Sequence, residues 1–301
     1  MRICSLLPSA SEIIAELGHV DSLVGVSGEC RRPGEIVGKP VVTAARIDTS
    51  ALTSREIDSA VRASLEEGGS LYAVDAALME ELRPDPLMEE LRPDLIVTQD
   101  LCAVCAVSSG DLATAFPLDV EVLSLDPKTL GGVAETFRVL ARRLGTPDRG
   151  RELADEFDAK IRSVADAVQG LGRRRIFFAE WLDPPFCAGH WIPEMIALAG
   201  GADVLGRPGE PSHTTDWDAA FEHQPELVIL APCGFGADEA VRRSEGLSFP
   251  CPAIAVDGDG YYSCPGPRLA DGVRQLGHVF HPDAVEDPGL PAVEVEPVVS
   301  S

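Results

Sequence analysis

The sequence predicts an α/β fold of two similar lobes, each with a mainly parallel sheet, and a repeated pattern is the first reason. Residues 92–100 and 224–232 both read as proline, an acidic residue, a short apolar run and a polar loop. Proline ends a preceding helix because it lacks an N–H and restricts the residue before it. The apolar runs have the length of strands buried on both faces, and they alternate with helical patterns. Two such lobes, joined by a long connecting helix, predict a ligand cleft between them.

Each lobe follows the same order of elements. In the first lobe we expect a strand at 3–7, a helix at 11–17, a short apolar step at 23–26 and strands at 95–98 and 120–126. In the second lobe we expect a strand at 175–179, a helix at 192–199, an apolar step at 204–206 and strands at 227–231 and 253–257. Gly18 and Gly200 follow the two helices, as left-handed helix caps commonly do.

Function is expected in the loops beyond the carboxyl ends of these strands, because ligands of parallel sheets collect there. These loops are 8–12, 27–33, 98–108, 181–191, 231–236 and 257–266.

The remaining segments complete the domain organisation. Apolar residues recur at helical spacing over 128–171, which predicts a helical connector and a stiff hinge. Residues 283–301 are acidic, rich in proline and valine and without a period, so they predict a flexible tail. The lobes are therefore expected at 1–127 and 172–282. The stretch 78–85 repeats as 87–94, too few copies for a solenoid, and we interpret it as an extra surface turn without function.

Composition limits the partners. The chain has 49 acidic and 25 basic residues and a net charge of −24, which argues against nucleic acids and anionic membranes as partners. No apolar run has the length of a membrane span, and the start is too short for a signal peptide. We therefore expect a cytoplasmic monomer if Met1 is the native start, and an extracytoplasmic protein if a signal has been removed. Six of the eight cysteines lie apart, without the spacing of a small disulfide-rich domain, which favours free thiols in a reducing compartment.

Cys102 and Cys105 form a CxxC motif in one of the expected loops. Such a motif is a redox pair, half of a zinc site, a disulfide or two packed thiols, and the sequence leaves these open. No second CxxC is present to complete a zinc site. A weaker metal hypothesis draws on side chains in other loops, namely Glu29, Cys30, Cys187, His190, Cys233 and Cys264.

The segment 181–191 contains two of the three tryptophans, a phenylalanine and a histidine. Aromatic rings on a proline-stiffened loop make a rigid apolar wall that loses little entropy on binding. His190 is placed to ligate a metal or donate a hydrogen bond. The alternative is that Trp181 and Phe186 belong to the core and that His190 caps the following helix.

Tyr261 and Tyr262, two of the three tyrosines, lie in the corresponding loop near the end of the chain. Tyrosine pairs suit a large ligand with amide edges. The preceding Asp-Gly-Asp-Gly lacks the rest of an EF-hand pattern. No nucleophile elbow, phosphate-binding loop or dinucleotide fingerprint is present, which favours a binding protein over an enzyme.

Several short motifs, in the same order along about residues 2–280, resemble one family. They are Leu-Leu-Pro-Ser-Ala-Ser-Glu at 6–12, Val-Gly-Val-Ser at 24–27, Arg-Pro-Asp-Leu-Ile at 92–96, Asp-Pro-Pro-Phe at 183–186 and Pro-Arg-Leu at 267–269. The chain resembles the helical-backbone (class III) substrate-binding proteins of ABC importers for vitamin B12 and iron chelates. The Pro-Pro-Phe loop and the 99–108 stretch look most similar to the cobalamin-binding branch.

The resemblance implies site residues. Phe186 matches an aromatic residue that packs on the corrin, and Tyr261 or Tyr262 matches an aromatic position on the opposite lobe. Glu29 and Gln99 depart from the tyrosine and tryptophan of the periplasmic B12 binder. The candidate ligand contacts are Pro8, Ser9, Glu29, Cys30, Gln99, Asp100, Trp181, Phe186, His190, Trp191, Phe235, Tyr261 and Tyr262.

The resemblance also implies partners. An acidic residue on each lobe docks on the permease, and Asp218 fits this role on the second lobe. The first-lobe position falls near the duplicated segment, at Asp75 or Glu80.

Taken together, the expected function is non-catalytic binding of a corrinoid in the cleft between the lobes, with cobalamin as ligand and no intrinsic cofactor. The protein would serve an ABC uptake system or act as a cytoplasmic corrinoid binder or chaperone. A ferric siderophore or haem is the nearest alternative, since Arg31 and Arg32 can pair with an anionic chelate. A metal-dependent enzyme or metal-handling protein, with zinc or iron held by Cys102, Cys105, Cys30 and His190, is the second alternative.

Overall fold

The computed structural model describes residues 1–45, 49, 51–66, 72–73, 93–100 and 120–295. The chain forms two compact units, which we describe one at a time. The first unit comprises Met1–Leu52, Glu56–Pro127 and Glu135–Leu153. The second comprises Thr53–Arg55, Lys128–Ala134 and Ala154–Ser301.

The first unit is built on a sheet that is parallel except at one edge. Its strands are β1 (Ile3–Ser5), β2 (Leu23–Ser27), β3 (Val41–Ala45), β4 (Tyr72–Ala73), β5 (Leu95–Thr98) and β6 (Glu121–Ser124), in the order β4-β3-β2-β1-β5-β6. Only the edge strand β4 pairs antiparallel, with β3. The helices of this part of the chain are α1 (Pro8–Glu16), the 3-10 turns η1 (Val20–Ser22) and η2 (Gly34–Ile36), and α2 (Ser54–Glu66).

Helix α1 begins three residues earlier than the sequence indicated. Pro8 is the first helical residue, a favourable position because its missing N–H has no partner within the helix there. Ile13 and Ile14 are buried, and Gly18 follows the helix with a φ of 81°, as expected for a left-handed cap. The helix thus starts directly at the carboxyl end of β1.

The second unit has a mixed sheet. Its strands are β7 (Arg174–Leu182), β8 (Pro185–Cys187), β9 (Gly201–Asp203), β10 (His213–Thr214), β11 (Leu227–Leu230), β12 (Ala253–Val256) and β13 (Ala292–Val295). The order is β10-β8-β7-β11-β12-β13, and β9 pairs with the first half of β7. Its helices are α8 (Ile192–Leu198), α9 (Trp217–Glu222), α10 (Ala237–Arg243), α11 (Gly258–Tyr261) and α12 (Leu269–Phe280).

Each of the two sheets has its own core of four adjacent parallel strands, so the prediction of two similar α/β lobes is confirmed. In the first unit β2, β1, β5 and β6 are adjacent and parallel. In the second unit β9, β7, β11 and β12 are adjacent and parallel in the same way. The two sequence stretches that share a pattern lead into β5 and β11, which occupy equivalent places in their sheets.

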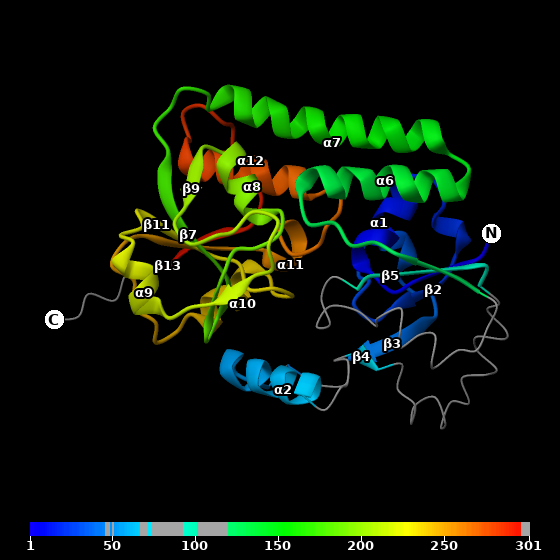
Figure 1. Cartoon of the computed structure of the whole chain (residues 1–301), viewed down its shortest axis with the longest axis horizontal. Helices are drawn as coiled ribbons and strands as arrows, with labels where there is room; N and C mark the ends of the chain where they lie inside the picture. The colour runs from blue at the N-terminus through cyan, green and yellow to red at the C-terminus, as the bar shows by residue number, and fades with distance from the viewer. Residues whose placement is uncertain (46–48, 50, 67–71, 74–92, 101–119, 296–301) are drawn as a thin grey trace. The chain divides into compact units, whose positions relative to one another are not determined.

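Alternation along β7 buries both faces of the second sheet. Phe177 packs in a cluster that includes Ala220 of α9 and Ala240 of α10, whereas its neighbour Phe178 contacts the ring of Tyr262 at 5.4 Å between centroids. Figure 1 shows α8 and α12 on one side of this sheet and α9 and α10 on the other. A strand covered on both faces explains the continuous apolar run in the sequence.

The predicted helical connector consists of two helices, α6 (Leu130–Leu144) and α7 (Pro147–Ala167), each with residues in both units. Gly145, with a φ of 78°, and Thr146 separate them, and Pro147 is the first residue of α7. Phe137 and Leu140 of α6 are fully buried. Among the described residues no helix combines the length and the apolar character needed to cross a bilayer.

Two expectations are wrong in detail. The segment read as a loop from Trp181 is a β-hairpin, because β7 continues to Leu182 and returns as β8. The segment read as a flexible tail contributes β13, which pairs antiparallel with β12. Val293 and Val295 are half-buried and alternate with exposed residues, a short period-two pattern that the prolines nearby obscured.

Tyr262 provides a test of the second unit's packing. Its hydroxyl donates to Gln275 Oε1 at 2.7 Å inside the core. We expect Tyr262→Phe to lower the free energy of unfolding by about 1–3 kcal/mol, because the carboxamide oxygen is then buried without its donor. Urea denaturation followed by circular dichroism measures the change. Tyr261→Phe removes the same group from a half-buried neighbour and should cost less than about 0.5 kcal/mol. Equal losses in both variants would contradict the role of the buried hydrogen bond.

Candidate functional site

Three loops meet at the carboxyl edge of the second unit's sheet, following β7, β11 and β12. The backbone N–H of Cys233 donates to the carbonyl of Glu180, and that of Asp259 donates to the carbonyl of Phe235. At Gly258 a side chain would lie 2.6 Å from the carbonyl oxygen of Pro232, so only glycine permits this close approach. The loops are therefore fixed against one another by their backbones.

The end of β7, the loop after β11 and the end of α10 together carry an aromatic surface, which we define as the rings of Trp181 and Phe235 with the guanidinium of Arg243. The ring centroids of Trp181 and Phe235 are 5.8 Å apart, and Arg243 Cζ lies 3.9 Å from the centre of the Phe235 ring. Arg243 is held by an ion pair with Glu239 at 2.8 Å, and its side chain is 8% exposed. Phe186 lies directly opposite Trp181 in the β7–β8 pairing, and it is half-buried like both rings.

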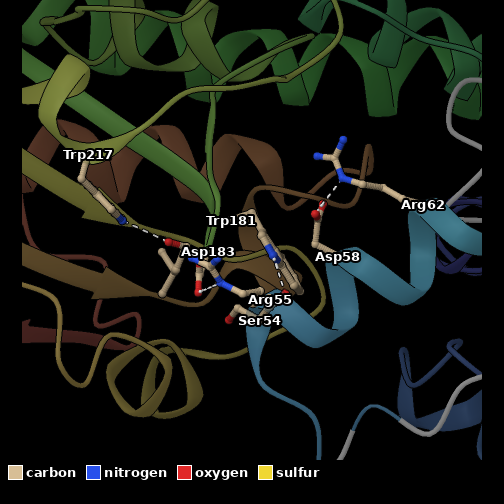
Figure 2. Close-up of polar contacts among 8 residues, drawn as sticks. Ser54, Arg55, Asp58, Arg62, Trp181, Asp183 and Trp217 are labelled. Atoms are coloured by element: carbon tan, nitrogen blue, oxygen red, sulfur yellow. Dashed lines mark hydrogen bonds and ion pairs between the residues drawn. The ribbon is translucent and has the colours of Figure 1, made fainter.

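Two residues that the sequence analysis did not single out contact this surface. The indole N–H of Trp181 donates to the backbone carbonyl of Ser54 at 3.1 Å (Figure 2). Arg55 Nε and Nη2 donate to the two carboxylate oxygens of Asp183 at 3.0 and 2.8 Å. Arg243 Nη1 lies 3.5 Å from Ser54 Oγ. The first turn of α2 is thus attached to the hairpin and to α10.

Further hydrogen bonds hold the hairpin in place within the second unit. The indole N–H of Trp217, at the start of α9, donates to the carbonyl of Leu182 at 3.1 Å (Figure 2). The carboxylate of Glu180 accepts from the backbone N–H of Gly189 at 2.7 Å and from the hydroxyl of Ser212. These contacts fix the hairpin on its core side, so Trp181 is presented at its other side.

Two predicted ligand contacts are buried inside the second unit. Tyr262 is 0% exposed and Trp191 is 5% exposed, and the indole N–H of Trp191 donates to the carbonyl of Tyr262 at 2.8 Å. Neither ring lies on the surface in this structure, and their role as ligand contacts stays a prediction. Burial, together with the charge of Lys128, lowers the pKa of His190, whose buried Nε2 has no hydrogen-bond partner. His190 does not cap the next helix, because the N-cap residue is Trp191.

Tyr261 stays half-buried at the carboxyl edge. The guanidinium of Arg268 lies 5.5 Å from its ring centre, at the limit of a cation–π contact. The expectation that Tyr261 or Tyr262 faces Phe186 from the opposite lobe is wrong, because all three belong to the second unit.

The predicted residues near α1 lie partly inside the first unit. Pro8 is half-buried and Ser9 is buried in the first turn of α1. Cys30 is buried and accepts a hydrogen bond from Ser11 Oγ at 3.3 Å, and burial raises its pKa to about 11. Because a protonated thiol is a poor metal ligand and nucleophile, Cys30 is suited to packing. Glu29 is half-buried and pairs with Arg31 at 3.4 Å.

The loop after β5 carries Gln99, which is buried, and Asp100, which is exposed. The backbone N–H of Asp100 donates to Asp126 Oδ1 at 2.6 Å, and Ser124 Oγ lies within 3.0 Å of carboxylate oxygens of both residues. This edge of the first unit is thus acidic, unlike the aromatic edge of the second.

The metal hypotheses receive no support from the described residues. Cys102 and Cys105 lie outside them, as do Asp75, Glu80 and nearly all of the duplicated stretch. Within the described part of the chain, no three His, Cys, Asp or Glu side chains are grouped to hold a metal ion. Cys187 is buried and Cys233 is exposed, and both are free thiols, whereas Cys264 is half-buried. Asp218 lies exposed in the first turn of α9, and its docking role stays a prediction.

The sequence profile of the periplasmic binding protein family matches residues 3–249. The chain belongs to this family of substrate-binding proteins. Its structure is similar to the periplasmic vitamin B12-binding protein BtuF of Vibrio cholerae, with a TM-score of 0.61, 19% identity and coverage of 92% of this chain and 94% of that one. It is also similar to a periplasmic haem-binding protein of Pseudomonas aeruginosa, with a TM-score of 0.66, 18% identity and coverage of 98% of both chains. These likenesses establish the class III substrate-binding fold.

Curated relatives match a shorter stretch. The vitamin B12-binding protein of Salmonella typhimurium is 20% identical over 161 residues, 53% of this chain and 60% of that protein. The vitamin B12-binding protein of Yersinia pestis is 20% identical over 164 residues, 53% of this chain and 57% of that protein. The chain thus spans less than two thirds of the length of these relatives.

Asp203, in β9 beside β7, has a raised carboxyl pKa. Burial raises its pKa to about 6, opposed by hydrogen bonds from the backbone N–H groups of Leu205 and Gly206. Its Oδ2 is buried without a hydrogen-bond partner. The folded state therefore holds the proton more tightly than the unfolded chain, whose carboxyl has a pKa of 3.8.

This difference predicts a pH dependence. The contribution of Asp203 to stability is fully present below pH 3.8 and is lost as the pH rises through about 6. We expect Asp203→Asn to match the wild type near pH 4 and to exceed its free energy of unfolding by roughly 2–3 kcal/mol at pH 7.5, because the amide avoids a buried charge. Urea unfolding at several pH values measures this difference in the free energy of unfolding. Asp216→Asn, at an exposed N-cap where Asn replaces Asp well, controls for the substitution itself. A constant difference between wild type and Asp203→Asn from pH 4 to 7.5 would refute the assignment.

Proposed function

We propose that the protein binds a corrinoid, with cobalamin as the ligand, on the aromatic surface of its second unit and without catalysis. The observation that carries this proposal is the pairing of Trp181 with Phe235 under a stacked Arg243, at the carboxyl edge of the sheet. Ligands of α/β sheets bind at this edge. Half-buried rings on a fixed hairpin bind a flat macrocycle with little loss of conformational entropy.

The family and its relatives support a transport role for this binding. The two bacterial relatives reported above are vitamin B12-binding proteins, and the Vibrio cholerae protein of similar fold binds vitamin B12. We propose that the chain delivers its ligand to an ABC permease and works outside the cytoplasm, as its relatives' periplasmic names suggest. In this proposal cobalamin is cargo, and the protein needs no cofactor of its own.

Haem or a ferric siderophore is the second candidate, and the arginines favour it. Arg243 lies over the Phe235 ring and Arg268 lies near the Tyr261 ring. Guanidinium groups beside aromatic rings suit a flat ligand that carries carboxylates, as haem does. The Pseudomonas aeruginosa protein of similar fold binds haem.

Ligand retention distinguishes the two candidates. Purified protein at micromolar concentration, mixed separately with cyanocobalamin and hemin and passed through a desalting column, should retain cobalamin absorbance at one equivalent. Retention of hemin alone would replace the first candidate by the second. Retention of neither would contradict both.

The aromatic surface is tested by matched substitutions. We expect Trp181→Ala and Phe235→Ala each to weaken binding of the retained ligand about tenfold, because each removes a stacking face worth about 1.4 kcal/mol. Trp181→Phe and Phe235→Leu are the controls. Trp181→Phe keeps a ring and should lose less than Trp181→Ala, whereas Phe235→Leu keeps apolar volume without a ring and should lose nearly as much as Phe235→Ala. Isothermal titration calorimetry measures the affinities, and unchanged affinity in both alanine variants would place the ligand elsewhere.

A further inference from the structure

We infer that Ser54 and Arg55 form a releasable cover on the aromatic surface, that Asp183 positions this cover, and that it limits how fast ligand enters and leaves. The inference rests on the proposed function for its kinetic part. Its structural part is that the ion pair of Arg55 with Asp183 holds Ser54 against Trp181, and this part rests on the contacts alone.

Three elements of the second unit converge on these two residues. Trp181 at the end of β7 donates to the Ser54 carbonyl, and Asp183 in the hairpin turn accepts twice from Arg55 (Figure 2). Arg243 at the end of α10 reaches the Ser54 hydroxyl at 3.5 Å. Ser54 is 6% exposed, although it is a polar residue at the first turn of a helix. Because Arg243 also stacks on Phe235, Ser54 contacts two of the three members of the aromatic surface.

Ser54 and Arg55 belong to a different unit from the chain on either side of Thr53–Arg55. Thr53–Arg55 belong to the second unit, whereas the chain up to Leu52 and from Glu56 belongs to the first. Ser54 and Arg55 contact the hairpin and α10 through side chains and one carbonyl group. Both residues lie in α2 and not in a strand of the sheet, so these contacts can break without disturbing the core of the second unit.

The strength of the anchor is suited to release. The side chains of Arg55 and Asp183 are 75% and 40% exposed, and ion pairs at such positions are weak because water and salt screen them. The bidentate geometry still fixes the direction of the guanidinium, and so the place of Ser54 against Trp181. The pair thus orients the cover and opposes its opening only slightly.

A neighbouring ion pair provides a matched control. Arg62 pairs with Asp58 at 2.7 Å four residues apart on the same helix, and Figure 2 shows this pair on α2 next to the cover. Removing the charge of Arg62 breaks one ion pair of α2, as removing the charge of Arg55 does. It leaves the contacts of Arg55 with the hairpin in place.

The structural part is tested without ligand. Protein labelled with 5-fluorotryptophan gives a fluorine resonance for Trp181 that is assigned by its absence in Trp181→Phe. We expect Arg55→Gln and Asp183→Asn to shift this resonance, and the combined exchange Arg55→Asp with Asp183→Arg to return it toward the wild-type position. Arg62→Gln should leave it in place. A Trp181 resonance that is identical in wild type, Arg55→Gln and Asp183→Asn would overturn the inference.

The kinetic part uses stopped-flow absorbance with cyanocobalamin or hemin, whichever the wild type retains. Loosening a cover lowers the barrier in both directions. We therefore expect association and dissociation both to become about two- to fivefold faster in Arg55→Gln and Asp183→Asn, with little change in Kd, and to recover in the exchange variant. Faster dissociation with unchanged association would instead show a lost ligand contact and overturn the cover. If neither probe binds, the proposed function fails, and the fluorine resonance alone decides whether the cover exists.

Discussion

The parallel alignment of β7, β11 and β12 is the constraint on which the proposed binding surface depends. Parallel strands end at the same edge, so the loops that follow them meet there although they are far apart in the chain. In the second unit this brings Trp181 beside Phe235 at 5.8 Å. Close backbone contact at Gly258 and hydrogen bonds between the loops then hold the arrangement.

Strand β7 has two roles that are separated along its length. Its residues Ile176–Ala179 are buried and pair with β11, and they carry Phe177 and Phe178 to opposite faces of the sheet. Its second half leaves β11, pairs with β8 and presents Trp181. The rigid core thus extends directly into the aromatic surface without an intervening loop, which limits the entropy lost when a flat ligand stacks on the rings.

The two units share a sheet topology but differ in the chemistry of their carboxyl edges. The first unit places Asp100 and Asp126 around the hydroxyl of Ser124, whereas the second places aromatic rings and guanidinium groups there. A common backbone arrangement therefore carries different side chains, as expected where function depends on the loops and not on the fold. The weak, exposed ion pair of Arg55 with Asp183 adds a contact that can be exchanged more easily than any in the core.

The sequence by itself determined the buried parallel strands β1, β5, β7, β11 and β12, the glycine ends of two helices and the concentration of aromatic residues around the hairpin. Buried parallel strands need continuous apolar runs, and helices that end at Gly18 and Gly200 need residues that tolerate a positive φ, so local pattern is sufficient for both. Only the tertiary structure decided which aromatic residues are presented. Tyr261 and Tyr262 are neighbours in the sequence, yet one is half-buried at the edge and the other is fully buried, because Tyr261 ends the short helix α11 and Tyr262 follows it with a different backbone conformation. The roles of Ser54, Arg55 and Arg243 were likewise invisible in the sequence, since each depends on contacts with residues that only folding brings near.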